Sequence, residues 1–223
     1  MAFNFDPGVM LDTLPMLMRG LKWTALITVG GLFFGFILGA GAGLMKLSRG
    51  WAARKFAGAY VETIRGTPML VQAMFLYFGV PMALGLRIPP LVAGIVVIAV
   101  NSGAYIAEIV RGAVQSINIG QFEAGRSIGL TRAQTMRYVI WPQAFRRMIP
   151  PLGNQFIISL KDTSLLAVIG VGELLRTGQE IVAVNFRAFE VYLTVGLVYL
   201  CMTMAIAHAL RRVEKRLAAR VRR

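Results

Sequence analysis

Two adjacent charged residues interrupt a long apolar stretch, and they are the sharpest sign of ligand chemistry in this sequence. Lys161 and Asp162 are the only charged residues between positions 148 and 172. If a helix starts at Asp162-Thr163-Ser164, its N-terminus and Lys161 would hold an anionic group such as a carboxylate, and Asp162 would hold a cationic one such as an ammonium group. The alternative is a structural Lys–Asp ion pair. Adjacent side chains on one continuous helix point about 100° apart, so the sequence leaves both interpretations open.

A second polar set occurs at helical spacing. Asn101, Tyr105 and Glu108 fall at i, i+4 and i+7, which places them on one face of a helix. Asn101 and Tyr105 either line a path for a polar solute or make hydrogen bonds between helices. Glu108 with Arg111, and Glu62 with Arg65, have the i,i+3 spacing of ion pairs at helix ends. The polar residues predicted to line a path are Asn101, Tyr105, Lys161, Asp162 and Ser164.

Other kinds of chemistry have no support in the sequence. Cys201 and His208 are the only residues of their types, so they cannot form an intrachain disulfide or a zinc site, and we expect both to be packing residues. A Walker A loop needs a Gly-Lys dipeptide to hold phosphates, and none occurs. The sequence therefore predicts no catalysis, no metal and no cofactor in this chain. Any work it does must be driven by a partner or by an ion gradient.

The composition predicts that these residues are positioned by membrane-spanning helices. The chain has 223 residues, of which 57% are hydrophobic and only 15% are charged, with a mean hydropathy of +0.65. Soluble domains average about 25% charged residues. An apolar helix of about 20 residues crosses a bilayer. We therefore expect one all-α integral membrane domain over 1–223 with five transmembrane helices, approximately 23–45, 60–80, 89–110, 148–172 and 190–210.

Basic residues predict the orientation of these spans. The net charge is +14, and 18 of the 24 Lys and Arg residues fall in the segments after the first, third and fifth spans. The positive-inside rule then places the N-terminus outside and the C-terminus in the cytoplasm. This accounts for the charge without a nucleic-acid partner. Residues 1–22 do not have a basic segment followed by an apolar core, so no signal peptide is predicted.

Four glycines in the first span recur at every fourth position, at 31, 35, 39 and 43. They lie on one stripe of a helix, where the lack of side chains lets another helix approach closely. The sequence predicts a tight helix seam, within one chain or between two.

The longest polar segment, 115–142, has the signals of a folded loop. Residues 121–128 are predicted to form a short helix that ends at Gly129 in a left-handed conformation. Thr131 and Gln134 have the spacing of a capping box for a second helix, 132–140, that stops by Pro142. This two-helix knob either docks a partner or lies on lipid headgroups.

The same loop resembles a known motif. Glu123-Ala124-Gly125, followed after three residues by Gly129 and after a further nine by Val139-Ile140-Trp141-Pro142, resembles the EAA loop of the permeases of ABC importers. Gly125 and Trp141 depart from the alanine and leucine of that pattern. Segments 62–68, 101–108 and 161–165 are similar to the polar amino acid permeases of this superfamily, and segments 178–181 and 185–188 favour its glutamine permeases.

The resemblance implies a function and a set of partners. The chain would be a permease subunit in a bacterial inner membrane, surrounded by lipid, importing a polar amino acid such as glutamine. It implies two copies of an ATPase subunit that carries ATP and Mg²⁺, a second permease that is identical or a close paralogue, and a periplasmic binding protein. The residues implied to couple the ATPase to the permease are Glu123, Ala124, Gly125, Gly129 and Pro142.

Two other classes of function remain open from the residues alone. One is a membrane scaffold that docks a cytoplasmic partner without transporting anything. The other is a carrier driven by an ion gradient, although such carriers usually contain inverted repeats, and the chain shows no internal repeat.

Overall fold

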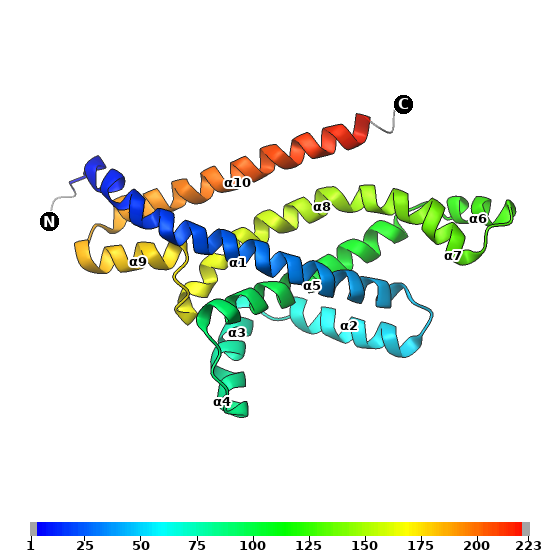
Figure 1. Ribbon diagram of the computed structural model, residues 1–223, viewed down its shortest axis with the longest axis horizontal. Coiled ribbons are helices and arrows are strands. Elements are labelled where there is room, and N and C mark those ends of the chain that lie inside the picture. Colours follow the sequence, from blue (N-terminus) through cyan, green and yellow to red (C-terminus); the bar gives the residue numbers. More distant parts are fainter. Residues whose placement is uncertain (1–3, 220–223) are drawn as a thin grey trace.

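The computed structural model describes residues 4–219, and all regular elements in that range are helical (Figure 1). In chain order they are α1 (Pro7–Leu47), α2 (Trp51–Arg65), α3 (Met69–Met74), η1 (Phe75–Gly79), α4 (Val80–Leu84), α5 (Pro90–Gln115), α6 (Ile119–Ser127), α7 (Arg132–Thr135), η2 (Met136–Ile140), α8 (Trp141–Asp162), η3 (Thr163–Ile169), α9 (Leu174–Asn185) and α10 (Ala188–Ala219). Three of the basic residues behind the predicted orientation, Arg220, Arg222 and Arg223, lie outside the described range.

Three of the described helices are long and apolar enough to cross a membrane. They are α1, α5 and α10, and a fourth span results if α2 and the segment Met69–Leu84 are counted as one bent span. α8 has 22 residues, which is long enough, but it carries Arg146, Arg147, Lys161 and Asp162. The fold is therefore an all-α membrane protein with three or four apolar candidate spans.

The centre of the molecule is a close contact between α1 and α5. Gly31, Gly35, Gly39 and Gly43 are buried in this contact. A Cβ atom at Gly39 would lie 2.5 Å from the carbonyl oxygen of Gly103, and one at Gly43 would lie 2.9 Å from that of Ala107. The predicted glycine seam is thus confirmed, and it lies within a single chain.

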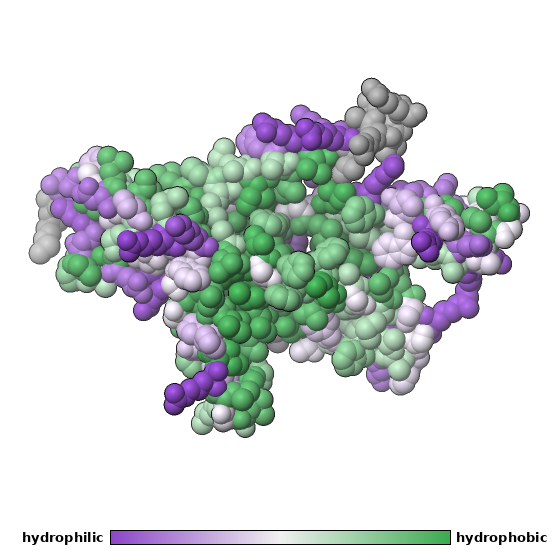
Figure 2. Space-filling model, in the orientation of Figure 1, coloured by the Kyte–Doolittle hydropathy of each residue, from purple (hydrophilic) through white to green (hydrophobic). Residues whose placement is uncertain are grey.

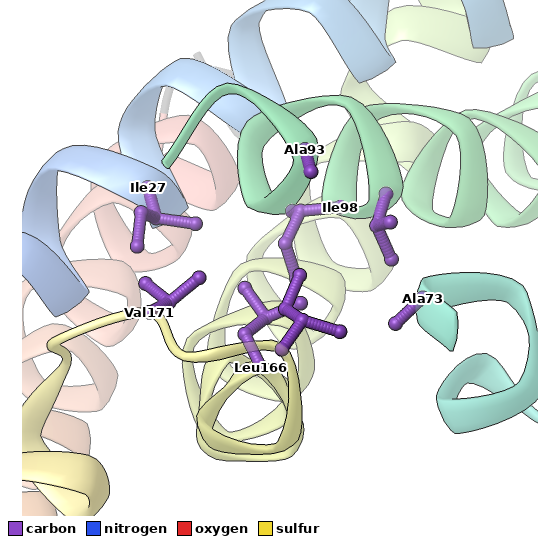
Figure 3. Packing of buried hydrophobic residues seen from close by; sticks show 8 residues of the cluster. Ile27, Ala73, Ala93, Ile98, Leu166 and Val171 are labelled. Atoms are coloured by element: carbon purple, nitrogen blue, oxygen red, sulfur yellow. The ribbon is translucent and has the colours of Figure 1, made fainter. Parts of the chain in front are cut away.

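A hydrophobic core extends this seam towards η3 and α3. Ile27 of α1 and Ile98 of α5 pack with Leu166 of η3, while Ala73 approaches from α3 (Figure 3). Leu166 is fully buried. Segments more than 60 residues apart in the chain are therefore held together around the point where α8 gives way to η3.

The first predicted span begins much earlier than expected. α1 starts at Pro7 instead of 23, because the Asp6 carboxylate caps it by accepting the Gly8 N–H at 2.8 Å. Leu17 is buried in a cluster with Leu174 of α9 and Val191 of α10. Tertiary packing therefore extends the helix through the segment that contains Asp12, Arg19 and Lys22.

The predicted span 60–80 contains a sharp bend in the structure. α2 and the segment Met69–Leu84 meet at an angle of 104°. Pro68 is extended, with φ −63° and ψ 136°, and ends the helical path. The break leaves carbonyl groups without helical donors. The Gln72 amide satisfies two of them, donating to the carbonyl oxygens of Ile64 at 2.7 Å and Thr67 at 3.1 Å.

The helix boundaries around the predicted span 148–172 also differ from the expected ones. The second knob helix does not stop by Pro142 but continues into α8, so Pro150 and Pro151 lie inside a helix instead of opening one. The reason is the wider turn of η2, in which the Trp141 N–H bonds to the carbonyl of Met136. This wider turn accommodates Pro142 in the first turn of α8. At its other end, α8 gives way to η3 after Asp162, and Gly170, with φ +79°, ends η3.

Candidate functional site

The predicted knob is a folded unit at one end of the molecule (Figure 1). α6 is capped by Asn118, whose side chain accepts the Gly120 N–H at 2.8 Å. Gly129 has φ +88°, and the Leu130 N–H closes the turn on the carbonyl of Gly125 at 3.2 Å. Thr131 and Gln134 form both bonds of a capping box. The left-handed glycine and the capping box are therefore confirmed.

Gly125, which departs from the EAA pattern, is explained by packing. It is buried, and a Cβ atom there would lie 2.7 Å from Cγ2 of Thr135, a fully buried residue of α7. Glu123 and Ala124 are exposed on α6. Ile119 and Ile128, at the two ends of α6, are 69% and 78% exposed. The knob therefore has a rigid interior and an exposed apolar surface.

Two exposed arginines belong to the same knob. Arg126 and Arg132 are exposed, and the guanidinium group of Arg132 lies 5.7 Å from the ring centre of Phe122. Pro142 is exposed at the start of α8. A partner of this knob would meet apolar side chains bordered by positive charge.

Lys161 and Asp162 lie at the end of α8 without binding each other. Lys161 is exposed and Asp162 is half-buried, and no nitrogen–oxygen contact within 4.0 Å joins them in the described chain. The Ser164 hydroxyl donates to the Lys161 carbonyl at 2.7 Å, and the Thr163 hydroxyl donates to that of Leu160 at 2.7 Å. These hydroxyls bond back to α8. η3 does begin after Asp162, but the Asp162 side chain makes no capping hydrogen bond and the Asp162 backbone stays in the α-helical region.

Asn101 and Tyr105 have different surroundings. Asn101 is 7% exposed, and its amide donates to Oε1 of Gln72 at 3.0 Å. This is the interhelix hydrogen bond that the sequence left as one of two options. Tyr105 is 37% exposed, and the guanidinium group of Arg65 lies 5.3 Å from its ring centre. No pattern in the sequence indicated Gln72 as the partner of Asn101, because the two residues meet only through the bend after α2.

Glu108 binds cations from three helices. Its carboxylate contacts Lys46 of α1 at 2.6 Å, Arg111 of α5 at 2.6 Å and Arg65 of α2 at 3.9 Å. The predicted Glu108–Arg111 pair is confirmed. Arg65 is within ion-pair distance of Glu108, and no Glu62–Arg65 pair forms in the described residues.

Glu173 is a buried acid that the sequence reasoning missed. It is fully buried before α9, and its carboxylate accepts the N–H groups of Leu175 at 2.9 Å and Arg176 at 2.7 Å. It also accepts the Tyr199 hydroxyl at 2.9 Å. Burial raises the pKa of the Glu173 carboxyl, and these three donors oppose the rise. The sequence did contain a signal for Glu173. It is an acid directly before the apolar pair 174–175, a position where its carboxylate can cap a helix.

The last two residues singled out from the sequence are not packing residues. Cys201 and His208 are both exposed on α10. A ring nitrogen of His208 lies 2.8 Å from the carbonyl oxygen of Met204, one turn earlier. They differ from expectation because α10 presents most of its surface outward, and only 11% of its most apolar stretch is buried within the described chain.

Comparison with known proteins gives close matches over most of the chain. A family model described as "Binding-protein-dependent transport system inner membrane component" matches residues 31–223. The chain is 53% identical to the glutamine transport system permease protein GlnP of Escherichia coli K12, over 96% of this chain and 98% of that protein. It is 37% identical to the probable glutamine ABC transporter permease protein GlnM of Bacillus subtilis, over 94% and 97%.

Solved structures are also similar. An amino acid ABC transporter crystallised with histidines has a chain that superposes with a TM-score of 0.92 and is 39% identical, covering 96% of this chain and 100% of that one. A chain of the inward-facing MetNI methionine ABC transporter superposes with a TM-score of 0.79 and is 25% identical, covering 92% and 98%.

Proposed function

Because the chain belongs to the family of binding-protein-dependent transport system inner membrane components, we propose that its substrate is glutamine, delivered by a periplasmic binding protein. The observation that carries this proposal is 53% identity to a glutamine permease over nearly the full length of both chains. The chain is a membrane transport component and not an enzyme. Neither a passive scaffold nor a carrier driven by an ion gradient accounts for this match.

The knob is proposed as the element that couples the chain to a separate ATPase subunit. Its exposed Ile119 and Ile128 offer apolar contacts, and the rigid turn at Gly129 fixes α6 relative to α7. We assign Glu123, Ala124, Gly125, Gly129 and Pro142 to this coupling site. Two copies of the ATPase would bind ATP and Mg²⁺. When the ATPase subunits close on the nucleotide, their movement would reach α8 through the continuous path α7–η2–α8.

The substrate path is proposed to run along the end of α8 and the adjoining face of α5. Lys161 and Asp162 have no ion-pair partner in the described chain, so both charges are available to a zwitterion. Ionisable residues in membrane segments are costly and usually functional. Tyr105 and Ser164 contribute polar groups, and Asn101 stiffens the path through its bond with Gln72.

The topology is proposed as five spans, with α8 and the bent segment 51–84 added to α1, α5 and α10. The N-terminus would be periplasmic and the C-terminus cytoplasmic, as the basic residues indicate. A second permease, identical or paralogous, would complete the membrane part of the transporter.

The proposed function is tested by reconstituting the chain with its ATPase in proteoliposomes and adding a glutamine-loaded binding protein. We expect ATP-dependent uptake of glutamine. Uptake that continues without ATP would contradict the ATP-driven importer. ATP-dependent uptake of another amino acid, without glutamine uptake, would contradict the substrate alone.

A further inference from the structure

The last helix continues beyond its apolar part. Residues 191–210 contain no Asp, Glu, Lys or Arg, and a helix of about 20 residues spans about 30 Å, the thickness of a hydrocarbon core. α10 runs on to Ala219, so its final turns lie at the level of the lipid headgroups. Arg211, Arg212 and Arg216 occupy these turns, and all three are exposed. These three arginines are here called the basic arc.

The basic arc faces away from the rest of the bundle. Leu210, directly before it, packs on α8, and its Cδ2 lies 2.6 Å from the position that a Cβ atom of Gly153 would take. Successive side chains of a helix point about 100° apart, so the three arginines point about 100–160° away from Leu210. In Figure 2 the end of α10 is a hydrophilic band on the outer edge of the molecule, apart from the knob that Figure 1 labels as α6 and α7. The arc is therefore turned away from the site proposed for the ATPase.

The positive charge of the arc is not balanced within the described chain. No carboxylate there lies within 4.0 Å of its guanidinium groups. The neighbouring Glu214 and Lys215 cancel each other in net charge. The sequence adds three more arginines after the described range, Arg220, Arg222 and Arg223. The arc is therefore available to an anionic partner.

An exposed apolar stripe on the same helix leads to the arc. Its members are between 40% and 52% exposed, and they are Leu193, Leu197, Leu200 and Met204. All four point within about 40° of the direction of Arg211. Leu200 lies about 16 Å before Arg211 along the helix, and one leaflet of hydrocarbon is about 15 Å thick. A lipid whose headgroup lies at Arg211 would therefore place its acyl chains along Met204 and Leu200.

The chemistry of the arc and the stripe identifies the partner. A phosphodiester accepts two parallel N–H···O bonds from one guanidinium group, and acyl chains cover the apolar stripe. A zwitterionic headgroup carries an ammonium group that the arginines repel, whereas an anionic headgroup does not. Clusters of about four to eight basic residues directly cytoplasmic of a spanning helix are typical of binding to anionic lipids.

We propose that the basic arc binds phospholipids with anionic headgroups, whose acyl chains lie along the apolar stripe. Such lipids fix the end of α10 at the membrane surface. The ATPase is a less suitable partner, because the arc faces away from the knob. This inference rests on the proposed function for the leaflet concerned, which the proposed topology makes cytoplasmic.

The test measures which phospholipids lie beside the arc in the assembled transporter. In a Cys201→Ser chain, Val213→Cys carries a fluorophore at a position that is 46% exposed, and the same chain without Val213→Cys gives the background. The transporter is reconstituted in phosphatidylcholine vesicles that contain nitroxide-labelled phosphatidylglycerol or nitroxide-labelled phosphatidylcholine. We expect phosphatidylglycerol to quench at a mole fraction at least about fivefold lower, the gain from one basic residue near an anionic surface. Added salt should reduce this difference.

Three variants decide whether the arc is responsible. Arg211→Gln, Arg212→Gln and Arg216→Gln in one chain should make both lipids quench equally. Two controls keep the net charge and should keep the preference, namely Lys at all three of these positions, and the pair Glu214→Gln, Lys215→Met. Equal quenching by the two lipids in the parent, or an unchanged preference in the Gln variant, would overturn the proposal. The measurement needs no transport and detects lipid in either orientation of the chain, so a failure of the proposed function is recognised separately in the uptake assay.

Discussion

Lys161 and Asp162 are the residues on which the proposed substrate chemistry depends. The double variant Lys161→Met, Asp162→Asn should fold and insert normally, because the two side chains form no ion pair that would be broken. Uptake of glutamine in proteoliposomes, normalised to folded protein, should be lost. The adjacent pair Glu214 and Lys215 on α10 provides a matched control, and Glu214→Gln, Lys215→Met should transport at the parent rate. Parent-level uptake by the first variant would refute the assignment.

Glu173 is a second residue whose role can be tested, and its role is structural. Glu173→Ala should lower the free energy of unfolding by about 1–3 kcal/mol, because two N–H groups at the start of α9 and the Tyr199 hydroxyl lose their acceptor. Thermal unfolding in detergent measures this. Glu180→Ala on the same helix breaks only an exposed pair with Arg176, and should change stability by less than about 1 kcal/mol. Equal effects of the two variants would contradict the role of Glu173.

The raised pKa of Glu173 adds a pH dependence to this prediction. The ionised carboxyl is less favourable in the folded chain than in the unfolded one. The stability that this group contributes is therefore fully present below its ordinary pKa, and it is lost as pH rises through the folded-state value. We expect the melting temperature of the parent to fall relative to that of Glu173→Gln as pH rises across this window.

At the scale of elements, the α1–α5 seam depends on the absence of side chains. Gly39→Ala would place a methyl group 2.5 Å from the Gly103 carbonyl oxygen, which belongs to a backbone that cannot move alone. We expect a loss of about 1–3 kcal/mol in stability, seen as a lower melting temperature. Gly41→Ala is the control, because nothing lies within 4 Å of its added carbon. A Gly39→Ala protein as stable as the Gly41→Ala protein would show that the seam is loosely packed.

The knob is the other element whose geometry can be tested. Gly129→Val should disrupt the turn between α6 and α7, because a β-branched residue is strongly disfavoured at φ +88°. Insertion into the membrane should persist, while ATP hydrolysis stimulated by the binding protein and uptake should both fall. Gly112→Val is the matched control on α5, where an added Cβ atom meets nothing within 4 Å. Normal coupling in Gly129→Val would contradict the docking role of the knob.

For the whole molecule, the prediction concerns orientation. In a Cys201→Ser background, Arg216→Cys should react with a thiol reagent only if the reagent crosses the membrane, and Asp12→Cys should react with an impermeant one. The physical reason is the retention of basic segments on the cytoplasmic side. Labelling of intact cells measures both. The opposite pattern would invert the proposed topology.

The sequence alone determined the features that depend on local chemistry and on spacing along one helix. The composition predicted a helical membrane protein because too few charged residues are available to cover a soluble surface. Gly129 and the Thr131–Gln134 capping box were predictable because turn and cap preferences act within a few residues. The glycine stripe in α1 predicted a close helix contact for the same reason, although it could not identify α5 as the neighbour.

Tertiary structure decided the features that depend on segments distant in the chain. Hydropathy indicated one span at 60–80, but α2 and the segment Met69–Leu84 meet at 104°, and Asn101 of α5 holds Gln72 beside this bend with a hydrogen bond of 3.0 Å. η3, which follows Asp162, is held by a core that Leu166 shares with Ile27 of α1 and Ile98 of α5. Glu173 is buried because α1, α9 and α10 meet around it. Burial is a property of several elements together, and a pattern within one segment does not contain it.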